Sequence, residues 1–321
     1  MQPALPPVSV VVCAYTEARW SQLLRAVDSV LSQEPPPVEV VVVIDHNDTL
    51  LARATQRLTR CQVLANRGAR GLSGARNTGV AAVTGDIVAF LDDDAAARPG
   101  WLAGMLRWFD DPATLGVAGR VDPVWPHGRP AWFPAEFDWV VGCSYTGLPT
   151  RAEPVRNPIG SSMSFRRAAM LSVDGFRDGV GRSGTTPLGC EETEFTIRLG
   201  RAHPGSRVIY DPAILADHWV SPERTGWAYF RARCWAEGLS KAAVRALVGA
   251  DDALRSERRY LARVLPRAVL RGLSRPGAGW QRTGAVVAGF GYTTAGYLAG
   301  LWRHRCRRAP GASLVPEEPA R

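Results

Sequence analysis

The chain has 321 residues, of which 46% are hydrophobic and 21% charged, so global disorder is excluded and one or two domains with a substantial core are expected. Its net charge of +9 comes almost wholly from arginine, since Lys241 is the only lysine, and indicates anionic partners such as nucleic acid, phosphorylated ligands or a membrane surface. The six cysteines are scattered and form no C-x-x-C pair, which argues against a zinc site or a disulfide framework and favours a reducing compartment.

The first half of the chain alternates apolar, β-branched runs with helical patterns. Residues 8–13 and 38–44 are typical of strands buried on both faces of a parallel sheet, and the segment between them places leucines and valines on one helical face. We then expect a helix around 49–59, a strand near 61–65, a helix over 73–83 and a strand over 86–91. This alternation predicts an α/β sheet with right-handed crossovers, in which ligands bind at the carboxyl ends of the strands. The N-terminus has no basic segment before its first apolar run, so we expect no signal peptide and a cytoplasmic location.

The second half is less regular. We expect, in order, a helix over 101–109, a Trp- and Pro-rich stretch over 124–139, a strand near 162–166, a helix over 191–201, a basic helical region over 226–275 and an uncharged run over 283–302. The uncharged run is long enough to span a bilayer but only mildly apolar, so a spanning helix and a buried or interfacial helix both remain open. Its Gly296-x-x-x-Gly300 spacing favours close helix packing.

Three consecutive acids, Asp92, Asp93 and Asp94, follow the strand over 86–91. In an extended segment Asp92 and Asp94 point the same way and Asp93 the opposite way, so two carboxylates can face one ligand. Oxygen ligands of this kind suit Mg²⁺ or Mn²⁺, which would neutralise a departing diphosphate. The alternative is a solvated polar turn.

The order of these segments resembles family 2 glycosyltransferases, the inverting enzymes of the GT-A fold. The matching segments are "VSVVVCAYTE", "VVVVIDHND", "RGLSGARNTG" continuing to "FLDDDA", and "GCEETEFTIRL", which together cover roughly residues 7–240. The resemblance implies a mixed, mainly parallel central sheet, followed here by a C-terminal helical extension. We expect three parts: a catalytic domain over 1–225, a basic helical region over 226–275, and an apolar helix with a polar tail over 276–321.

The resemblance also implies a nucleotide-sugar site, formed by Ala14, Tyr15, Glu17, Asp45, Arg76, Asp92 and Asp93. In the family, the position of Asp45 hydrogen-bonds the base and that of Asp94 binds the metal most directly, with Asp92 nearer the sugar. Other interpretations stay open: Tyr15 as an aromatic at the edge of the core, Asp45 as a helix cap, and Arg76 in a surface pair with Asp86.

Two further acids and a histidine complete the implied site. Glu192 stands where the family has its catalytic aspartate, beside Glu191, and is the expected general base. Because this position departs from aspartate by one methylene, the alternative is that these glutamates only complement a helix N-terminus. By resemblance, His218 lies near the metal or diphosphate; the alternative is a structural histidine. Arg224, Arg231 and Arg233 are candidates for contacting phosphate, or form a solvated basic face.

The basic helical region predicts contact with a membrane. Arginines recur every four residues, at Arg259, Arg263, Arg267, Arg271 and Arg275. A basic amphipathic helix is typical of an element drawn to anionic lipid, here at the inner face of the cell membrane, although a solvated face above the catalytic domain is the alternative.

These patterns lead to one expected function and two rivals. We expect transfer of a single sugar from a nucleotide-diphosphate donor, with UDP favoured, to a hydroxyl of an envelope polysaccharide or a lipid-linked acceptor, with Mg²⁺ or Mn²⁺. A polysaccharide synthase is disfavoured because no Q-x-x-R-W segment is present. The rivals are a non-catalytic nucleotide-sugar-binding or scaffolding protein and a nucleic-acid binder; no nucleic-acid module is recognisable, so we expect no nucleic-acid partner.

Overall fold

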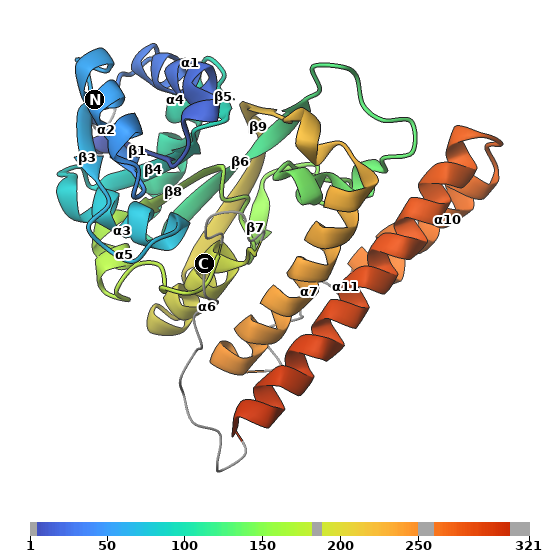
Figure 1. Ribbon diagram of the computed structural model, residues 1–321. Coiled ribbons are helices and arrows are strands. Elements are labelled where there is room, and N and C mark those ends of the chain that lie inside the picture. The colour runs from blue at the N-terminus through green and yellow to red at the C-terminus, as the bar shows by residue number, and fades with distance from the viewer. Residues whose placement is uncertain (1–4, 182–187, 250–259, 309–321) are drawn as a thin grey trace, which may run out of the picture.

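The computed structural model describes residues 5–181, 188–249 and 260–308. Its first half contains β1 (Val8–Ala14), η1 (Glu17–Arg19), α1 (Trp20–Leu31), β2 (Glu39–Ile44), α2 (Asp48–Arg57), β3 (Gln62–Ala65), α3 (Leu72–Ala82), β4 (Ile87–Asp92), β5 (Ala95–Ala97), α4 (Trp101–Leu106), η2 (Arg107–Asp110), β6 (Thr114–Val124) and η3 (Ala135–Val141). The second half contains β7 (Glu153–Val155), β8 (Ser162–Arg166), α5 (Arg167–Leu171), α6 (Glu191–Ala202), β9 (Arg207–Trp219), η4 (Pro222–Arg224), α7 (Trp227–Val248), the π-helical turn η5 (Tyr260–Val264), α10 (Leu265–Leu273) and α11 (Ala278–Arg308) (Figure 1).

One sheet organises the described part of the chain, in the order β3-β2-β1-β4-β8-β6-β9-β5, with β7 beside β9. Strands β3, β2, β1 and β4 are parallel, and β8 then runs antiparallel to both β4 and β6. The expected α/β architecture with a mixed sheet is therefore confirmed.

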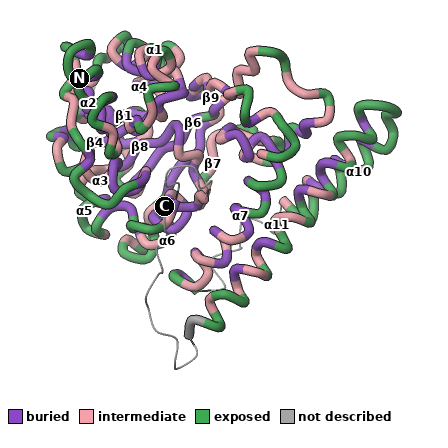
Figure 2. The backbone as a smooth tube through the Cα atoms, in the orientation of Figure 1, coloured by how far each residue is buried: buried purple, intermediate pink, exposed green. Residues whose placement is uncertain are grey.

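Side-chain alternation along the strands separates two core layers. Val10 and Val12 point toward α1, α2 and α4, whereas Val11 points toward α3 and α6. Both layers are completely buried at the sheet, which explains why these strands are continuous apolar runs (Figure 2).

The parallel strands end at one edge, and this places the polar residues of the site. Cys13 of β1 lies beside Asp92 of β4, and Ala14 lies beside Ile44, the residue before Asp45. The long strand β9 reaches the same edge, where His218 pairs with Ala95 of β5. Residues more than 200 positions apart in sequence are thereby brought together.

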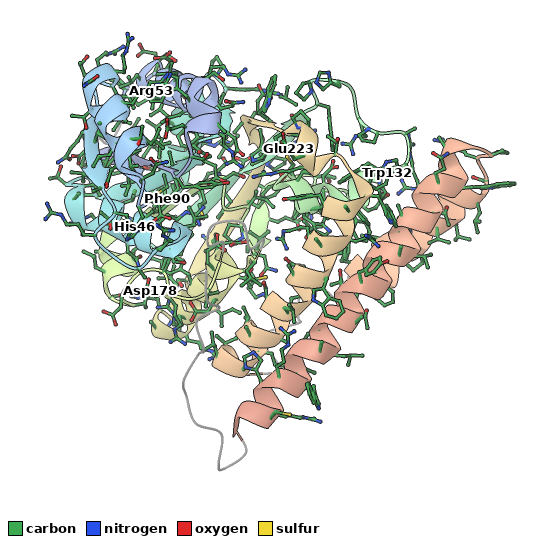
Figure 3. The ribbon with its side chains drawn as sticks, viewed as in Figure 1. His46, Arg53, Phe90, Trp132, Asp178 and Glu223 are labelled. Carbon is green, nitrogen blue, oxygen red and sulfur yellow. The ribbon has the colours of Figure 1, made fainter. Side chains whose placement is uncertain are left out.

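The C-terminal helices, α7, α10 and α11, form a third packed region to one side of the sheet (Figure 1). Phe137 of η3, Phe230 of α7 and Val286 of α11 share its apolar core, and Trp132 lies beside the start of α7 (Figure 3). The π-helical turn η5 ends where α10 begins, and Pro266 lies in the first turn of α10. Arg259, the first arginine of the predicted stripe, lies outside the described residues.

Close packing of α7 against α11 explains the glycine spacing. A Cβ on Gly296 would collide with the Trp235 carbonyl, and one on Gly238 would collide with the Thr293 carbonyl. The Gly296-x-x-x-Gly300 spacing thus lets α11 pack closely against α7. Within residues 5–181, 188–249 and 260–308, no helix combines the length and apolar character needed to cross a membrane.

This packing predicts opposite effects for two glycine substitutions on α11. Alanine gains about 1 kcal/mol of helix propensity at either position. At Gly291, where a Cβ meets nothing within 4 Å, we expect the melting temperature to stay the same or rise. Gly296→Ala should lower it, because overpacking against the α7 backbone costs about 1–3 kcal/mol. Thermal unfolding of the two variants tests this, and equal melting temperatures would contradict the packing.

Candidate active site

A cavity of about 550 Å³ lies between the carboxyl edge of the sheet and the C-terminal helices. The loops after β1, β2 and β4 line one side, and α6 lines the floor together with the segment 157–161. Residues of α7, η5 and α11 line the opposite side. Of the residues predicted for the site, Ala14, Tyr15, Asp45, Arg76, Asp92, Asp93, Asp94, Glu191, Glu192 and His218 line this cavity.

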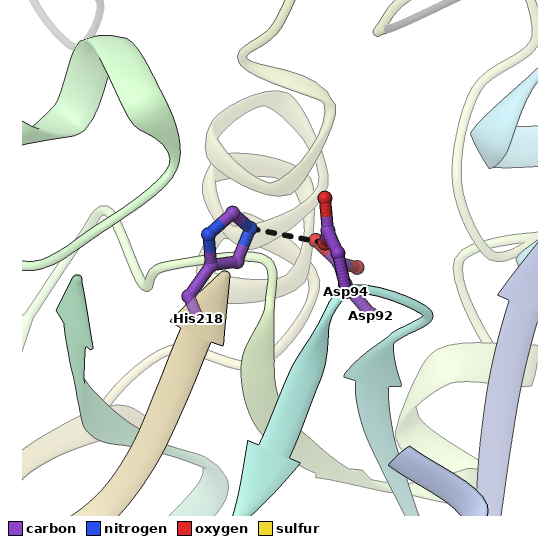
Figure 4. Close-up of side chains that lie close together, drawn as sticks. All are labelled: Asp92, Asp94 and His218. Carbon is purple, nitrogen blue, oxygen red and sulfur yellow. Dashed lines mark ion pairs between the residues drawn. The ribbon is translucent and has the colours of Figure 1, made fainter. Parts of the chain in front are cut away.

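Asp92, Asp94 and His218 form a compact ligand set (Figure 4). One ligand atom from each lies within 4.8 Å of the others, and His218 Nε2 is 3.0 Å from an Asp94 carboxylate oxygen. His218 Nδ1 is buried and has no hydrogen-bond partner among the described residues. Two carboxylates and an imidazole are donors that Mn²⁺ or Mg²⁺ accepts, so these residues fit a divalent cation.

Arginines compensate the crowded acids. Arg19 Nη1 lies 2.8 Å from Asp93 and 2.9 Å from Asp94, and Arg224 lies 3.4 Å from Asp94. Burial disfavours the charged form of Asp94, but contacts with His218 and Arg19 hold its pKa well below the usual range. Burial also raises the pKa of Asp93 to about 6, against the opposing effect of Arg19.

The expected orientation of Asp93 is wrong. Strand β4 ends at Asp92, so Asp93 and Asp94 lie in a turn rather than on alternate faces of an extended segment. Both side chains contact Arg19, and all three acids line the cavity. Arg19 follows β1 in a short 3-10 helix, and no local sequence pattern marks it as a partner of acids 74 residues away.

Arg76 lies at the centre of the site and is 1% exposed. It pairs with Glu191 at 3.1 Å and Asp92 at 3.4 Å, and it donates to the Gly160 carbonyl at 2.9 Å. The surface pair with Asp86 that the sequence left open is thus replaced by a buried bridge between β4 and α6. Asn77, next in sequence, donates to the Phe176 carbonyl and accepts from the Phe176 amide, and so fixes that loop.

The three glutamates at the start of α6 have different environments. Glu191 is paired with Arg76, and Glu194 is fully buried against Arg198 at 2.8 Å. Glu192 is half-buried and lines the cavity. Burial, followed by the neighbouring charge of Glu191, raises the pKa of Glu192 well above its usual value. A carboxylate with a raised pKa facing a cavity is suited to accepting a proton.

The predicted base-binding residues surround the ends of β1 and β2. Asp45 accepts hydrogen bonds from Asn66 at 2.6 Å and from the Gly71 amide at 3.0 Å, and so fixes the loop before α3. It does not cap α2, because Asn47 does so. Tyr15 is 37% exposed beside Arg19, which argues against the interpretation as a core aromatic. Glu17 is exposed and lies outside the residues that line the cavity.

Two solved structures share this fold. A mannosyltransferase from Pyrobaculum calidifontis, in complex with GDP-Man and Mn²⁺, superposes with a TM-score of 0.57 over 94% of this chain and 88% of that chain, at 19% identity. GalNAc-T7 with UDP, GalNAc and Mn²⁺ superposes with a TM-score of 0.53 over 81% of this chain and 55% of that chain, at 16% identity. The expected GT-A fold with C-terminal helices is confirmed.

Sequence comparison shows the family. Glucosyl-dolichyl phosphate glucuronosyltransferase from Haloferax volcanii is 35% identical over 238 residues, which cover 73% of this chain and 76% of that protein. Mouse polypeptide N-acetylgalactosaminyltransferase 4 is 29% identical over 249 residues, 70% of this chain and 41% of the mouse protein. The model of glycosyl transferase family 2 matches residues 9–172. The chain therefore belongs to glycosyl transferase family 2 and is an enzyme that transfers a sugar from a nucleotide-sugar donor.

Proposed function

We propose that the enzyme transfers a single sugar, with inversion, from a UDP-linked donor to a hydroxyl of a lipid-linked acceptor. One observation carries the proposal. The cluster of Asp92, Asp94 and His218 lines the same cavity as the half-buried carboxylate of Glu192. The Haloferax relative supports a lipid-linked acceptor, since its name describes a glycosylated dolichyl phosphate as substrate. An envelope polysaccharide is the other acceptor expected from the sequence.

In this proposal Asp92, Asp94 and His218 hold Mn²⁺ or Mg²⁺. The bound cation supplies Lewis-acid stabilisation of the leaving diphosphate. Arg19 and Arg224 line the same wall and add positive charge beside it. Tyr15 and Asp45 lie at the adjoining strand ends, where the nucleoside is proposed to bind.

Glu192 is the proposed general base. It accepts the proton of the acceptor hydroxyl while the acceptor oxygen bonds to the anomeric carbon. The bond from that carbon to the diphosphate oxygen breaks on the opposite face, which inverts the anomeric configuration. Arg76 pairs with both Glu191 and Asp92, and so fixes the position of the start of α6 relative to Asp92. We thus assign Arg76 and Glu191 to positioning and Glu192 to proton transfer.

We also propose that the C-terminal helices bind the surface of an anionic membrane, which would bring a lipid-linked acceptor to the cavity. The side of α10 and α11 away from the sheet is exposed (Figure 2). The exposed apolar side chains of α10 and α11 include Leu270, Trp280, Leu298 and Trp302, each 59–69% exposed. Four exposed arginines lie on η5, α10 and the turn after it: Arg263, Arg267, Arg271 and Arg275. The divisions at residues 225 and 275 and the location at the inner membrane face remain predictions.

The metal assignment predicts that Asp94→Asn abolishes sugar transfer. This substitution keeps the shape of the side chain while it removes the carboxylate charge. Transfer to an acceptor should fall to background, whereas thermal unfolding should show a folded protein. For the wild type, EDTA should stop transfer and added Mn²⁺ or Mg²⁺ should restore it. Full activity of the variant, or of the wild type in EDTA, would refute the metal role.

The raised pKa of Glu192 predicts the pH dependence of transfer. Because the base must be ionised, the rate should rise with pH through the raised pKa of Glu192. Glu192→Gln should lower kcat by about 10²–10⁴-fold. Glu191→Gln should lower activity less than Glu192→Gln does, since it weakens the pair with Arg76 but leaves the base in place, and it should move the acidic limb to lower pH, since Glu191 raises the pKa of Glu192.

Profiles of kcat/KM against pH for the three proteins test this assignment. An acidic limb that is unmoved in Glu191→Gln, or a Glu192→Gln variant with the wild-type rate, would contradict it.

The membrane proposal predicts charge-dependent vesicle binding. The protein should sediment with vesicles containing phosphatidylglycerol and release at high salt, because each arginine near an anionic surface contributes about 1 kcal/mol. A Trp280→Ser, Trp302→Ser double variant should bind less. Leu171→Ser, at an exposed position on α5, is the matched control and should bind like the wild type. Equal binding to neutral vesicles, or no loss in the double variant, would overturn the proposal.

A further inference from the structure

Residues of α7 line the cavity beside the start of α6. Glu237 accepts a hydrogen bond at 3.4 Å from Cys190, which lies two residues before Glu192. On its own helix, Glu237 forms i,i+4 pairs with Arg233 at 2.8 Å and with Lys241 at 3.2 Å. All five residues line the cavity. The wall that α7 contributes to the cavity therefore begins next to the proposed base.

Helix α11 continues this wall, because it packs directly against α7 (Figure 1). A Cβ on Gly238, next to Glu237, would collide with the carbonyl of Thr293 on α11. Positions i, i+3, i+4 and i+7 lie on one face of an α-helix. The residues of α11 that line the cavity have this spacing: Phe290, Thr293, Thr294 and Tyr297.

Two leucines add an apolar part to the same wall. Tyr260 Oη donates to the Glu136 carbonyl at 2.6 Å, which fixes the turn η5 against η3. Leu261 of η5 and Leu265 at the start of α10 both line the cavity. Leu265 is buried in the apolar core of the C-terminal helices, whereas Leu261 is 43% exposed.

The cavity wall meets an exposed stripe on α11. Positions 287, 290, 294, 298 and 302 recur every three or four residues, so they form one stripe along the helix. Its apolar members are 45–69% exposed: Val287, Phe290, Leu298 and Trp302. Phe290 and Thr294 belong both to this stripe and to the cavity wall. The cavity therefore opens onto the surface of α11 that we propose to contact the membrane.

An opening of this kind suits a molecule with a polar head and an apolar chain. Charged residues surround Glu192, whereas Leu261 and Phe290 expose apolar surface where the cavity opens. Covering apolar surface with an apolar group is favourable, and contiguous exposed apolar residues are typical of ligand-binding grooves. A polar head would lie at Glu192 while a hydrocarbon chain covers Leu261 and Phe290.

We propose that Leu261, Leu265 and Phe290 bind the hydrocarbon chain of a lipid-linked acceptor and so select acceptors that carry such a chain. The chain runs from the acceptor sugar at Glu192 past these three residues to the exposed stripe of α11. The acceptor then enters the cavity from the membrane surface. This proposal rests on the proposed function and adds the subsite that recognises the lipid part of the acceptor.

Alkyl glucosides of increasing chain length test the subsite. Methyl, hexyl and octyl β-glucoside share one sugar and differ only in the chain. Calorimetry with the full-length protein, UDP and Mn²⁺, below the micelle concentration, should show affinity that rises about fourfold for each buried methylene. Phe290→Ser and Leu261→Ser should each weaken binding of octyl glucoside by about tenfold, because they remove part of the apolar wall. Phe290→Leu should retain the dependence on chain length.

Leu298→Ser is the matched control, because Leu298 is exposed on the same stripe but does not line the cavity. It should keep the wild-type dependence on chain length, and thermal unfolding should show that each variant is folded. If octyl glucoside does not bind the wild type, or binds no more tightly than methyl glucoside, the proposal is wrong; this comparison needs no variant. Equal losses in Leu298→Ser and Phe290→Ser would also overturn it, since the chain would then lie on the outer surface of α11.

Donor binding separates this subsite from the nucleotide site. Phe290→Ser should bind UDP as tightly as the wild type does, and weaker binding would make the acceptor assignment wrong. These binding experiments involve no turnover. Failure of sugar transfer to lipid-linked acceptors would therefore count against the proposed function, while the dependence of binding on chain length alone decides the subsite.

Discussion

Three adjacent carboxylates at the end of a buried strand repel one another unless positive groups compensate them. In this protein the compensation comes from distant segments: Arg19 after β1, Arg76 on α3, and His218 and Arg224 at and after the end of β9. Each of these contacts fixes one wall of the cavity relative to the acids. The sheet edge, the start of α6 and the segment after β9 are therefore held together by the same charges to which we assign roles in the proposed reaction.

Arg76 is the link between the two halves of the site. Its guanidinium lies over the rings of Phe90 and Phe176 and contacts two carboxylates, Asp92 through Nη2 and Glu191 through Nη1. A cation in this position lets Asp92 and Glu191 lie close together, while Glu192 stays outside the pair. Under the proposed function, this explains how one carboxylate at the start of α6 is free for proton transfer while its two neighbours are committed to pairs.

Much of the fold could be predicted from local sequence. The strand at 8–13, the helix after it and the acids at 92–94 are set by apolar periodicity and by the positions of strand ends, and the family resemblance added Glu192 and His218. The irregular half was harder, because β6 and β9 are long strands interrupted by proline and polar residues and are defined by pairing with each other. Asp93 was misplaced because the strand ends at Asp92, two residues earlier than an extended triplet requires.

Contacts between distant segments account for what the sequence did not reveal. Nothing in the sequence near Arg19 indicates that this side chain reaches the acid cluster. Arg231 is exposed and Arg233 is buried, although the local sequence around the two is the same. The i,i+4 pairs around Glu237 are visible in the sequence, but their placement on the cavity depends on how α7 packs against α11. A side-chain role that depends on how two helices pack can be identified only from the three-dimensional structure.

The central claim is that the strand-end acids bind a cation together with a histidine from β9. Anomalous diffraction from crystals grown with UDP and Mn²⁺ tests it directly. We predict one strong manganese peak within bonding distance of Asp92, Asp94 and His218, in contact with the diphosphate. A peak elsewhere, or a diphosphate bound by Arg19 and Arg224 with no manganese at the acids, would contradict the account.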